Sequence, residues 1–179
     1  MKERYPVESH AKLDDMSVKE YTESLSGVTL SGWSENKTAK YVKGKRMGKE
    51  QKKWDVVAPH YKYKLIEVRN MWKVSAHFGP STTTGVGRGD RAVAIIHEET
   101  ESKMEAIDSY VIFDLRKFPD FRVFEIPSSL IYDMWKEAKR KNFPRSLGTF
   151  SKGGGITQNR FDKLFPYEKF KLVAVGEEI

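Results

Sequence analysis

The sequence predicts one mixed α/β domain in which a central β-sheet is flanked by helices. Runs of β-branched and aromatic residues that suit strands alternate along the chain with segments of helical periodicity. The length of 179 residues is enough for one well-buried core and short for two. No internal repeat or linker divides the sequence, so we expect residues 1–179 to fold as a single domain.

The N-terminal third is expected to contain two helices separated by a break. Residues 1–16 are polar and predict a loosely ordered arm. A serine that can cap a helix opens the segment 17–25, whereas glycines bound residues 27–32 and predict a break. A second serine, followed by a glutamate, opens a helix over residues 34–42. Two glycines then interrupt residues 43–53, which we expect to be a basic loop.

A β-hairpin is expected next. Residues 54–58 (WDVVA) are short, apolar and β-branched, and residues 63–69 (YKLIEVR) alternate between apolar and polar side chains. The four residues between them, 59–62, have the length of a hairpin connection. Residues 72–78 predict another strand, and the glycine- and threonine-rich run 79–89 predicts a loop.

The C-terminal half continues the alternation of helices and strands. An aspartate can cap the helix expected over residues 90–106, with Val93, Ile96 and Met104 available to the core. The remaining expected elements are paired strands at 109–115 and 121–126, a helix capped by Ser128 or Ser129 with Ile131, Met134, Trp135 and Ala138 inward, a short helix at 158–164 and a strand at 170–175.

Composition excludes several kinds of site and location. The chain has no cysteine, which excludes disulfides and thiol catalysis, and its four histidines are too scattered for a structural zinc site. No apolar run approaches the roughly 20 residues that a membrane helix requires, and the N-terminus lacks the apolar stretch of a secretory signal. We therefore expect a cytoplasmic protein with no membrane partner.

Positive charge is concentrated in two segments. Residues 36–54 hold eight basic residues and one acidic residue, a net charge of +7 that equals the excess of the whole chain. Residues 136–163 hold eight basic and two acidic residues. Basic segments with interleaved glycines and aromatics suit a polyanion, because each neutralised phosphate releases bound counterions. The two segments indicate a nucleic acid partner; the alternative for each is an ordinary solvated surface.

Two acidic residues on the expected hairpin suit a metal site. Glu67 and Arg69 are two positions apart on one strand and share a face, and Asp55 lies on the preceding strand. An antiparallel pair joined by a short turn can bring the two carboxylates together. With the backbone carbonyl of Val68, they would form an oxygen cage suited to Mg²⁺. Such an ion lowers the pKa of bound water and neutralises charge on a phosphate under attack.

The order of these residues resembles the signature of the PD-(D/E)xK nuclease superfamily, in which an aspartate is followed, on a neighbouring strand, by (Asp/Glu)-x-Lys. In this sequence the signature would be Asp55, a twelve-residue step, and then Glu67-Val68-Arg69. The expected helix, hairpin, further helix and two strands also resemble that superfamily over roughly residues 34–140. The layout is similar to that of small type II restriction endonucleases, which implies a restriction-endonuclease-like core.

The resemblance implies further candidate residues. Some members of the superfamily supply a carboxylate from the helix before the motif, which makes Glu35 a candidate third metal ligand. The alternative for Glu35 is a first-turn glutamate favoured by the helix dipole. Arg69 takes the place of the motif lysine, and because an arginine keeps its charge, it can hold a phosphate but cannot accept a proton. If the chemistry needs a lysine, two others lie near the motif. Lys64 is on the opposite face of the strand from Arg69, and Lys73 lies beyond the end of the strand.

The sequence therefore supports two hypotheses. The first is a Mg²⁺-dependent, sequence-specific endonuclease that hydrolyses double-stranded DNA as a homodimer, with Asp55, Glu67 and Arg69 as catalytic residues. The second is a non-catalytic DNA- or RNA-binding protein that uses residues 36–53 and 136–160. The candidate nucleic-acid-binding residues are Lys43, Lys45, Arg46, Lys49, Lys52, Lys53, His77, Ser81, Thr82, Thr83, Thr84 and Arg88.

Overall fold

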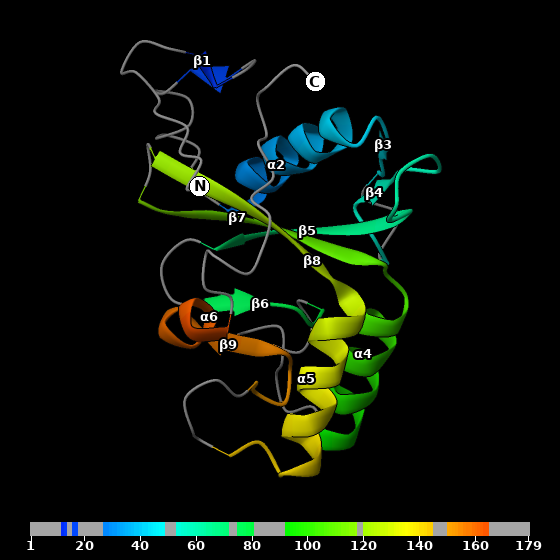
Figure 1. The fold of residues 1–179 in the computed structure, drawn as a ribbon, viewed down its shortest axis with the longest axis vertical. Coiled ribbons are helices and arrows are strands. Elements are labelled where there is room, and N and C mark those ends of the chain that lie inside the picture. Colours follow the sequence, from blue (N-terminus) through cyan, green and yellow to red (C-terminus); the bar gives the residue numbers. More distant parts are fainter. Residues whose placement is uncertain are drawn as a thin grey trace.

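A five-stranded mixed β-sheet forms the centre of the structure, which is a computed structural model (Figure 1). The sheet has the order β3-β4-β5-β7-β8, in which β5 and β7 run parallel and the other neighbours are antiparallel. Its strands are β3 (Lys45–Arg46), β4 (Val56–Val57), β5 (Leu65–Met71), β7 (Ser109–Lys117) and β8 (Asp120–Pro127). The structure describes residues 12–13, 16–17, 27–48, 53–71, 75–80, 92–117, 120–144 and 150–164.

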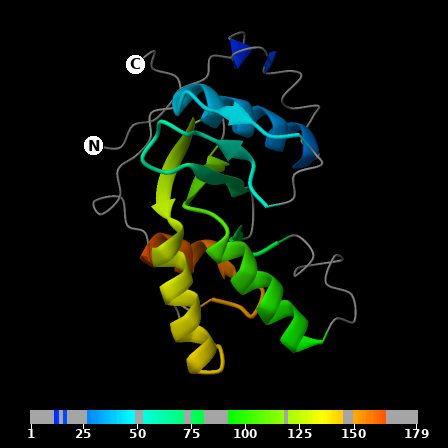
Figure 2. The same ribbon diagram turned by 90° about the vertical axis from the view of Figure 1, so that its right-hand side faces the viewer.

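Helices flank the sheet on both sides. Figures 1 and 2 show α2 against one face, with α4, α5 and α6 on the other side. The helices are α2 (Gly27–Tyr41), α4 (Val93–Glu105), α5 (Ser128–Arg140) and α6 (Gln158–Leu164). Two small antiparallel pairs complete the described elements, namely β1 (Lys12–Leu13) with β2 (Met16–Ser17) and β6 (Ser75–His77) with β9 (Gly155–Thr157). Among the described helices, none is long and apolar enough to cross a membrane.

Two apolar clusters occupy the two faces of the sheet. The first packs Trp33 of α2 against Ile66 and Val68 of β5, and the second packs Met71 of β5 with Trp135 of α5. Because successive side chains of a strand point to opposite faces, the residues of β5 divide between the clusters. Glu67 and Arg69 consequently lie on the same face as Met71, toward α4.

Helix α2 is longer than the sequence predicts. The helix begins at Gly27, so the break expected at residues 27–32 is wrong. Glycine disfavours a helix by only about 1 kcal/mol, which tertiary packing can outweigh. Here, Trp33 is buried with its ring 5.5 Å from that of Phe113. Gly32 also leaves room for Arg46, because a Cβ there would lie 3.3 Å from its guanidinium.

The expected hairpin is confirmed. Val56 pairs with Ile66 and Val57 with Leu65 across antiparallel strands, although β4 is shorter than the predicted 54–58. The expected loop at 43–53 contains a short strand instead, because Lys45 and Arg46 pair with β4. Gly44 permits this approach, since a Cβ at that position would lie 2.6 Å from the carbonyl oxygen of Val57.

The helix expected over residues 90–106 is observed as α4. Of its three predicted core residues, two are buried and the prediction for the third is wrong. Ile96 and Met104 are buried, as predicted, whereas Val93 is 39% exposed. The first turn of α4 lies at the end of the helix remote from the sheet, where few described elements are available to cover it (Figure 2). An apolar residue in that turn therefore remains in contact with solvent.

The remaining elements agree with the sequence where the structure describes them. The strands β7 and β8 pair as predicted, and α6 begins at the expected residue. Helix α5 begins at Ser128, after Pro127, so the expected serine cap is wrong; the Ser128 hydroxyl donates to the carbonyl of Met104 at 2.6 Å instead. Ile131, Trp135 and Ala138 are buried. Strand 72–78 is observed as the shorter β6, which pairs with β9 outside the central sheet. The strand expected at 170–175, most of the helix expected at 17–25 and most of the arm lie outside the described residues.

A buried ion pair fastens α6 to the sheet. The Asp114 carboxylate on β7 is 4% exposed and accepts hydrogen bonds from Arg116 Nε at 2.8 Å and Nη2 at 2.9 Å. The same guanidinium donates to Asp162 of α6 at 2.7 and 2.9 Å. These contacts raise the pKa of Arg116, chiefly through the hydrogen bond with Asp114.

We predict that Arg116→Met lowers the free energy of unfolding by about 3–5 kcal/mol, because it removes the guanidinium that neutralises the buried Asp114 carboxylate. The matched control is Asp162→Asn, whose side chain is 48% exposed and whose loss should cost about 1 kcal/mol or less. Urea denaturation followed by circular dichroism measures both variants. Equal losses in the two would contradict the role assigned to Asp114.

Candidate functional site

The structure brings Asp55 and Glu67 together on one side of the hairpin. The N–H of Asp55 donates to the carbonyl of Ile66 at 3.0 Å, and its Oδ2 accepts the N–H of Val68 at 2.8 Å. Asp55 is therefore held between the residues that flank Glu67 in β5. The negative charge of Asp55 raises the pKa of Glu67, as expected when one carboxylate lies near another. Asp55 and Glu67 therefore lie in one electrostatic neighbourhood, and their joint binding of a metal stays a prediction.

Glu67 is buried and is neutralised by two cations. The residue is 2% exposed, and its Oε1 lies 2.7 Å from Arg69 Nη2. Its Oε2 accepts a hydrogen bond from Lys103 Nζ. Burial is the main cause that raises the pKa of Glu67; the charges of Arg69 and Lys103 oppose it, while that of Asp55 adds to it. Glu67 and Arg69 thus share a face, as predicted.

Lys103 is a site residue that the sequence reasoning missed. It extends from α4, its side chain is 9% exposed, and Nζ also donates to the carbonyl of Lys53 at 2.6 Å. Burial lowers the pKa of Lys103 despite the attraction of Glu67. A signal was present in the sequence. Lys103 follows the buried Ile96 and Thr100 at helical spacing and is therefore a lysine on the inward face of α4.

Arg69 is anchored at both sides of the site. Besides Glu67, its Nη2 contacts the carbonyl oxygen of Gly79 at 3.1 Å, just after β6. Its buried Nε has no hydrogen-bond partner among the residues that the structure describes. The Arg69 side chain is 26% exposed, so part of it remains within reach of an anionic ligand beside Glu67.

Glu35 lies on α2 and is held by another partner. Its Oε2 is 2.6 Å from Arg46 Nε. The pKa of Glu35 is raised, first by burial and also by the charge of Asp55, while Arg46 and Arg69 lower it. Glu35 therefore belongs to the same electrostatic neighbourhood as the hairpin carboxylates. Its role as a third metal ligand stays a prediction, as does that of the Val68 carbonyl.

The hairpin offers two carboxylates to a divalent ion, and metal binding there stays a prediction. Across the described ranges, no three Asp, Glu or His side chains converge to hold a metal, so an all-protein cage is not built there. Mg²⁺ usually keeps several waters and binds through one or two carboxylates together with phosphate oxygens. Asp55 and Glu67 supply that pair. Both oxygens of Glu67 already contact a cation, Arg69 on one and Lys103 on the other.

The predicted nucleic-acid-binding residues fall into different environments. Lys43, Lys45 and Lys53 are exposed, whereas Arg46 is engaged by Glu35. His77 lies in β6, and burial lowers its pKa to about 4, so it is neutral near pH 7 and offers no charge to a phosphate. The other predicted residues lie outside the described residues, namely Lys49, Lys52, Ser81, Thr82, Thr83, Thr84 and Arg88.

The second basic segment is largely paired with acidic side chains. Lys139 of α5 contacts Glu101 of α4 at 2.8 Å, and Lys136 contacts Asp133 at 3.3 Å. Arg140 and Lys141 both pair with Glu137. Asp133 and Glu137 of α5 itself, together with Glu101 of α4, therefore compensate much of the charge of α5.

No protein-family model matches the chain, and no curated protein is significantly similar to it. The chemistry of the site therefore carries the functional inference.

We predict that protonation of His77 makes the free energy of unfolding depend on pH. Its pKa falls from 6.5 when the chain is unfolded to about 4 when it is folded. The stabilising effect is fully present above pH 6.5 and is lost as the pH falls toward 4, because only the unfolded chain gains that proton in this range. Between pH 6.5 and pH 4, this residue should lower the free energy of unfolding of the wild type by on the order of 2–3 kcal/mol. The variant His77→Gln should not show that loss.

Urea denaturation at a series of pH values measures this difference between the wild type and His77→Gln. His60→Gln, in the exposed hairpin turn, controls for the loss of one histidine. A parallel pH profile for the wild type and His77→Gln would contradict the prediction.

Proposed function

We propose that the protein is a metal-dependent DNA endonuclease of the PD-(D/E)xK nuclease superfamily, similar to a type II restriction enzyme. The observation that carries the proposal is that Asp55, just before β4, and Glu67 in β5 share one electrostatic neighbourhood, with Arg69 and Lys103 against the second carboxylate. Two carboxylates and two cations at one position are the groups that phosphodiester hydrolysis requires.

The order of the elements supports the same proposal. Helix α2 precedes the β4–β5 hairpin, and α4 then leads into β7 and β8. This is the order for which the sequence resembles the superfamily. The parallel pairing of β5 with β7 also brings α4 back over the face that bears Glu67, which explains how a residue far along the chain reaches the site.

Each site residue has a role that follows from its contacts. Asp55 and Glu67 would hold Mg²⁺, which when bound supplies a water of lowered pKa and neutralises charge on the phosphate. Arg69 is fixed by Glu67 and Gly79, and the exposed part of its side chain would hold a phosphate oxygen. Lys103 orients Glu67 and places a second positive charge, in addition to that of Arg69, beside the Glu67 carboxylate. Neither cation needs to move a proton for these functions.

A homodimer is part of this proposal. A duplex with a palindromic site has a two-fold axis, and two identical subunits related by such an axis can present one site to each strand. Cleavage of both strands would then leave symmetric ends, which sequencing of the products reveals.

We predict that Asp55→Asn and Glu67→Gln each slow cleavage at least about 10³-fold, which corresponds to about 4 kcal/mol of lost transition-state stabilisation. The assay incubates supercoiled plasmids and unmodified phage DNA with Mg²⁺ or Mn²⁺ and follows nicked and linear products. Glu98→Gln, an exposed carboxylate on α4, is the matched control and should cleave at the wild-type rate. Full activity in both site variants would refute the assignment.

We predict that Lys103→Met slows cleavage by about 10²–10³-fold, the usual cost of removing one positioned donor from a reacting centre. DNA affinity should change little, because the ammonium is buried against Glu67. Lys136→Met, on the exposed face of α5, controls for the loss of a lysine, and circular dichroism confirms folding. Loss of affinity without loss of rate in Lys103→Met would contradict the role.

A non-catalytic DNA- or RNA-binding protein is the second candidate. It is favoured by one observation, namely that both oxygens of Glu67 are already paired with Arg69 and Lys103. Under this function, nucleic acid binds in a salt-dependent manner while neither Mg²⁺ nor Mn²⁺ produces nicks. Metal-dependent nicking that requires Asp55 eliminates this candidate.

A further inference from the structure

We infer that Tyr110 of β7 is a positioning residue for Arg69, and that the backbone just after β6 connects the two. Arg69 is the residue proposed above to hold a phosphate, so this inference rests on the proposed function. It adds the support that the guanidinium needs in order to keep one position. A tyrosine within an apolar strand is otherwise typical of ordinary core packing.

The Arg69 guanidinium is oriented by two acceptors that share one of its nitrogens. Its Nη2 lies 2.7 Å from Glu67 Oε1 and donates to the carbonyl oxygen of Gly79 at 3.1 Å. Because Nη2 carries two N–H bonds in a planar group, the two acceptors together fix the orientation of the guanidinium plane. Glu67 alone would leave that plane able to rotate about a single contact. The place of the Gly79 carbonyl therefore determines where the exposed part of Arg69 points.

Tyr110 holds the peptide carbonyl that directly precedes this acceptor. Its hydroxyl donates to the carbonyl oxygen of Phe78 at 2.6 Å, and both side chains are fully buried. The two rings also meet edge to face, with centroids 5.0 Å apart. Phe78 and Gly79 are consecutive, so two side chains of the central sheet bind consecutive peptide groups. Movement of one of these carbonyls moves the next, because peptide units are planar and only two dihedral angles separate neighbours.

The sheet places Tyr110 beside the charged site. In the parallel pairing of β5 with β7, Tyr110 is in register with Glu67. Tyr110 also packs in the apolar cluster that contains Met71, on the face that bears Glu67 and Arg69. Burial raises the pKa of Tyr110 most; the charge of Arg69 lowers it and that of Glu67 raises it. The hydroxyl therefore lies within electrostatic reach of both charged groups.

A glycine closes the other side of the connecting backbone. The Phe78 N–H donates to the carbonyl of Gly154 at 3.1 Å. Gly154 has a φ of +80°, and a Cβ on it would lie 2.7 Å from the nitrogen of Gly79. A larger residue there would push against the backbone that carries the acceptor of Arg69. Phe78 and Gly79 are thus held between Tyr110 of the sheet and the turn that precedes β9.

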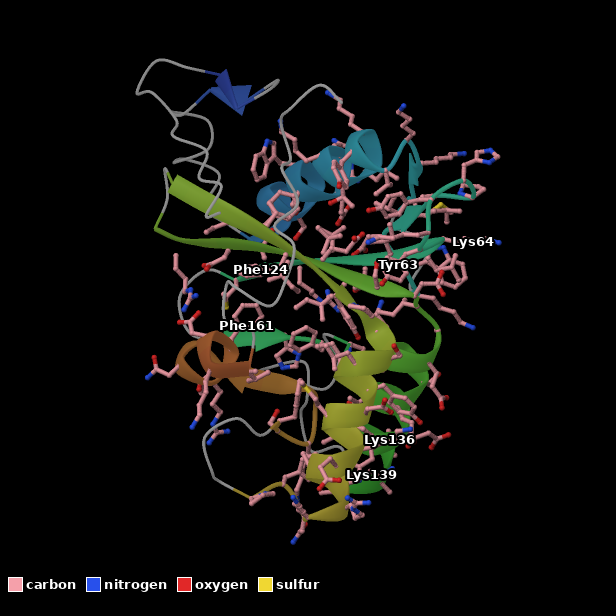
Figure 3. All side chains as sticks on the ribbon, in the orientation of Figure 1. Tyr63, Lys64, Phe124, Lys136, Lys139 and Phe161 are labelled. Carbon is pink, nitrogen blue, oxygen red and sulfur yellow. The ribbon has the colours of Figure 1, made fainter. Side chains whose placement is uncertain are left out.

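An apolar contact holds the same small unit on the sheet. The strands β6 and β9 pair with each other and contact α6. Figure 3 shows Phe161 of α6 and Phe124 of β8 facing one another between the helix and the sheet, and their ring centroids are 5.5 Å apart. This contact fixes the unit as a whole. The hydroxyl of Tyr110 fixes the end of β6, from which Arg69 takes its second acceptor.

The size of the expected effect follows from geometry. Tyr110 is fully buried, so it acts on a substrate only through Arg69. A misplacement of about 1 Å at a reacting centre can slow a reaction about 10²-fold. Loss of the hydroxyl removes one support of the connecting backbone and should displace the guanidinium by a fraction of that distance. We therefore expect a loss of rate of about tenfold, with DNA affinity nearly unchanged because the charge of Arg69 remains.

The first experiment measures the position of Arg69 without any reaction. The buried Nε of Arg69 has no hydrogen-bond partner among the described residues, so burial is what protects its proton from exchange with water. In ¹⁵N-labelled protein kept in EDTA, Tyr110→Phe should speed the exchange of this proton about three- to tenfold, the effect of one hydrogen bond. The Arg69 signal is identified by its absence in Arg69→Met.

Tyr61→Phe is the matched control. The Tyr61 hydroxyl also donates a hydrogen bond, to Glu125 at 3.2 Å, but its ring packs against the cluster on the other face of the sheet. Both variants should melt about 2–4 °C below the wild type, whereas only Tyr110→Phe should alter the exchange at Arg69. Equal exchange at Arg69 in the wild type and in Tyr110→Phe would overturn the inference.

The second experiment is a double-mutant cycle on the rate of DNA cleavage with Mg²⁺. Tyr110→Phe should lower kcat about tenfold and leave KM for the duplex nearly unchanged. In the Arg69→Met background, the same substitution should change kcat less than about twofold, because the group that it positions is gone. A residue that only stabilises the core would act equally in both backgrounds. Additive losses would therefore refute the positioning role.

The two experiments separate this inference from the proposed function. Faster exchange at Arg69 in Tyr110→Phe, together with no cleavage of any DNA by the wild type, would support the positioning of Arg69 and refute the nuclease. Cleavage by the wild type, with unaltered exchange and unaltered kcat in Tyr110→Phe, would support the nuclease and overturn the role of Tyr110.

Discussion

The buried carboxylate of Glu67 is the interaction on which the rest of the site depends. A carboxylate that is 2% exposed costs several kcal/mol to desolvate unless opposite charges compensate it. Arg69 and Lys103 supply that compensation, and Asp55 adds a second negative charge to the same neighbourhood. The arrangement therefore concentrates charges of both signs at the end of a hairpin, where the sheet is not covered by apolar side chains alone.

Much of the hairpin and its acidic pair could be predicted from the sequence because the information is local. Asp55 and Glu67 lie on strands joined by a short turn, so strand alternation and antiparallel pairing together place them side by side. The shared face of Glu67 and Arg69 follows from the same period of two. The strands β7 and β8, and helix α5, were likewise set by local patterns that the structure confirms.

The features that were missed depend on contacts between distant residues. Lys103 reaches Glu67 across 36 positions, and only the parallel pairing of β5 with β7 brings α4 to that face. The start of α2 was missed because the burial of Trp33 outweighs the weak helix propensity of two glycines. The second basic segment has a strong positive charge in the sequence, yet Lys139 is paired with Glu101 of α4, a partner that linear composition does not locate.

The crossover from β5 through α4 to β7 also has a consequence for biosynthesis. Glu67 leaves the ribosome well before Lys103, and β7, which aligns α4 with the site, follows later still. Until those residues have been translated, the nascent chain holds an acidic side chain whose ammonium partner does not yet exist. The hairpin can form early, but its charged centre is completed only when the parallel strand docks, so the assembly of the site is tied to a long-range β pairing, which is intrinsically slow.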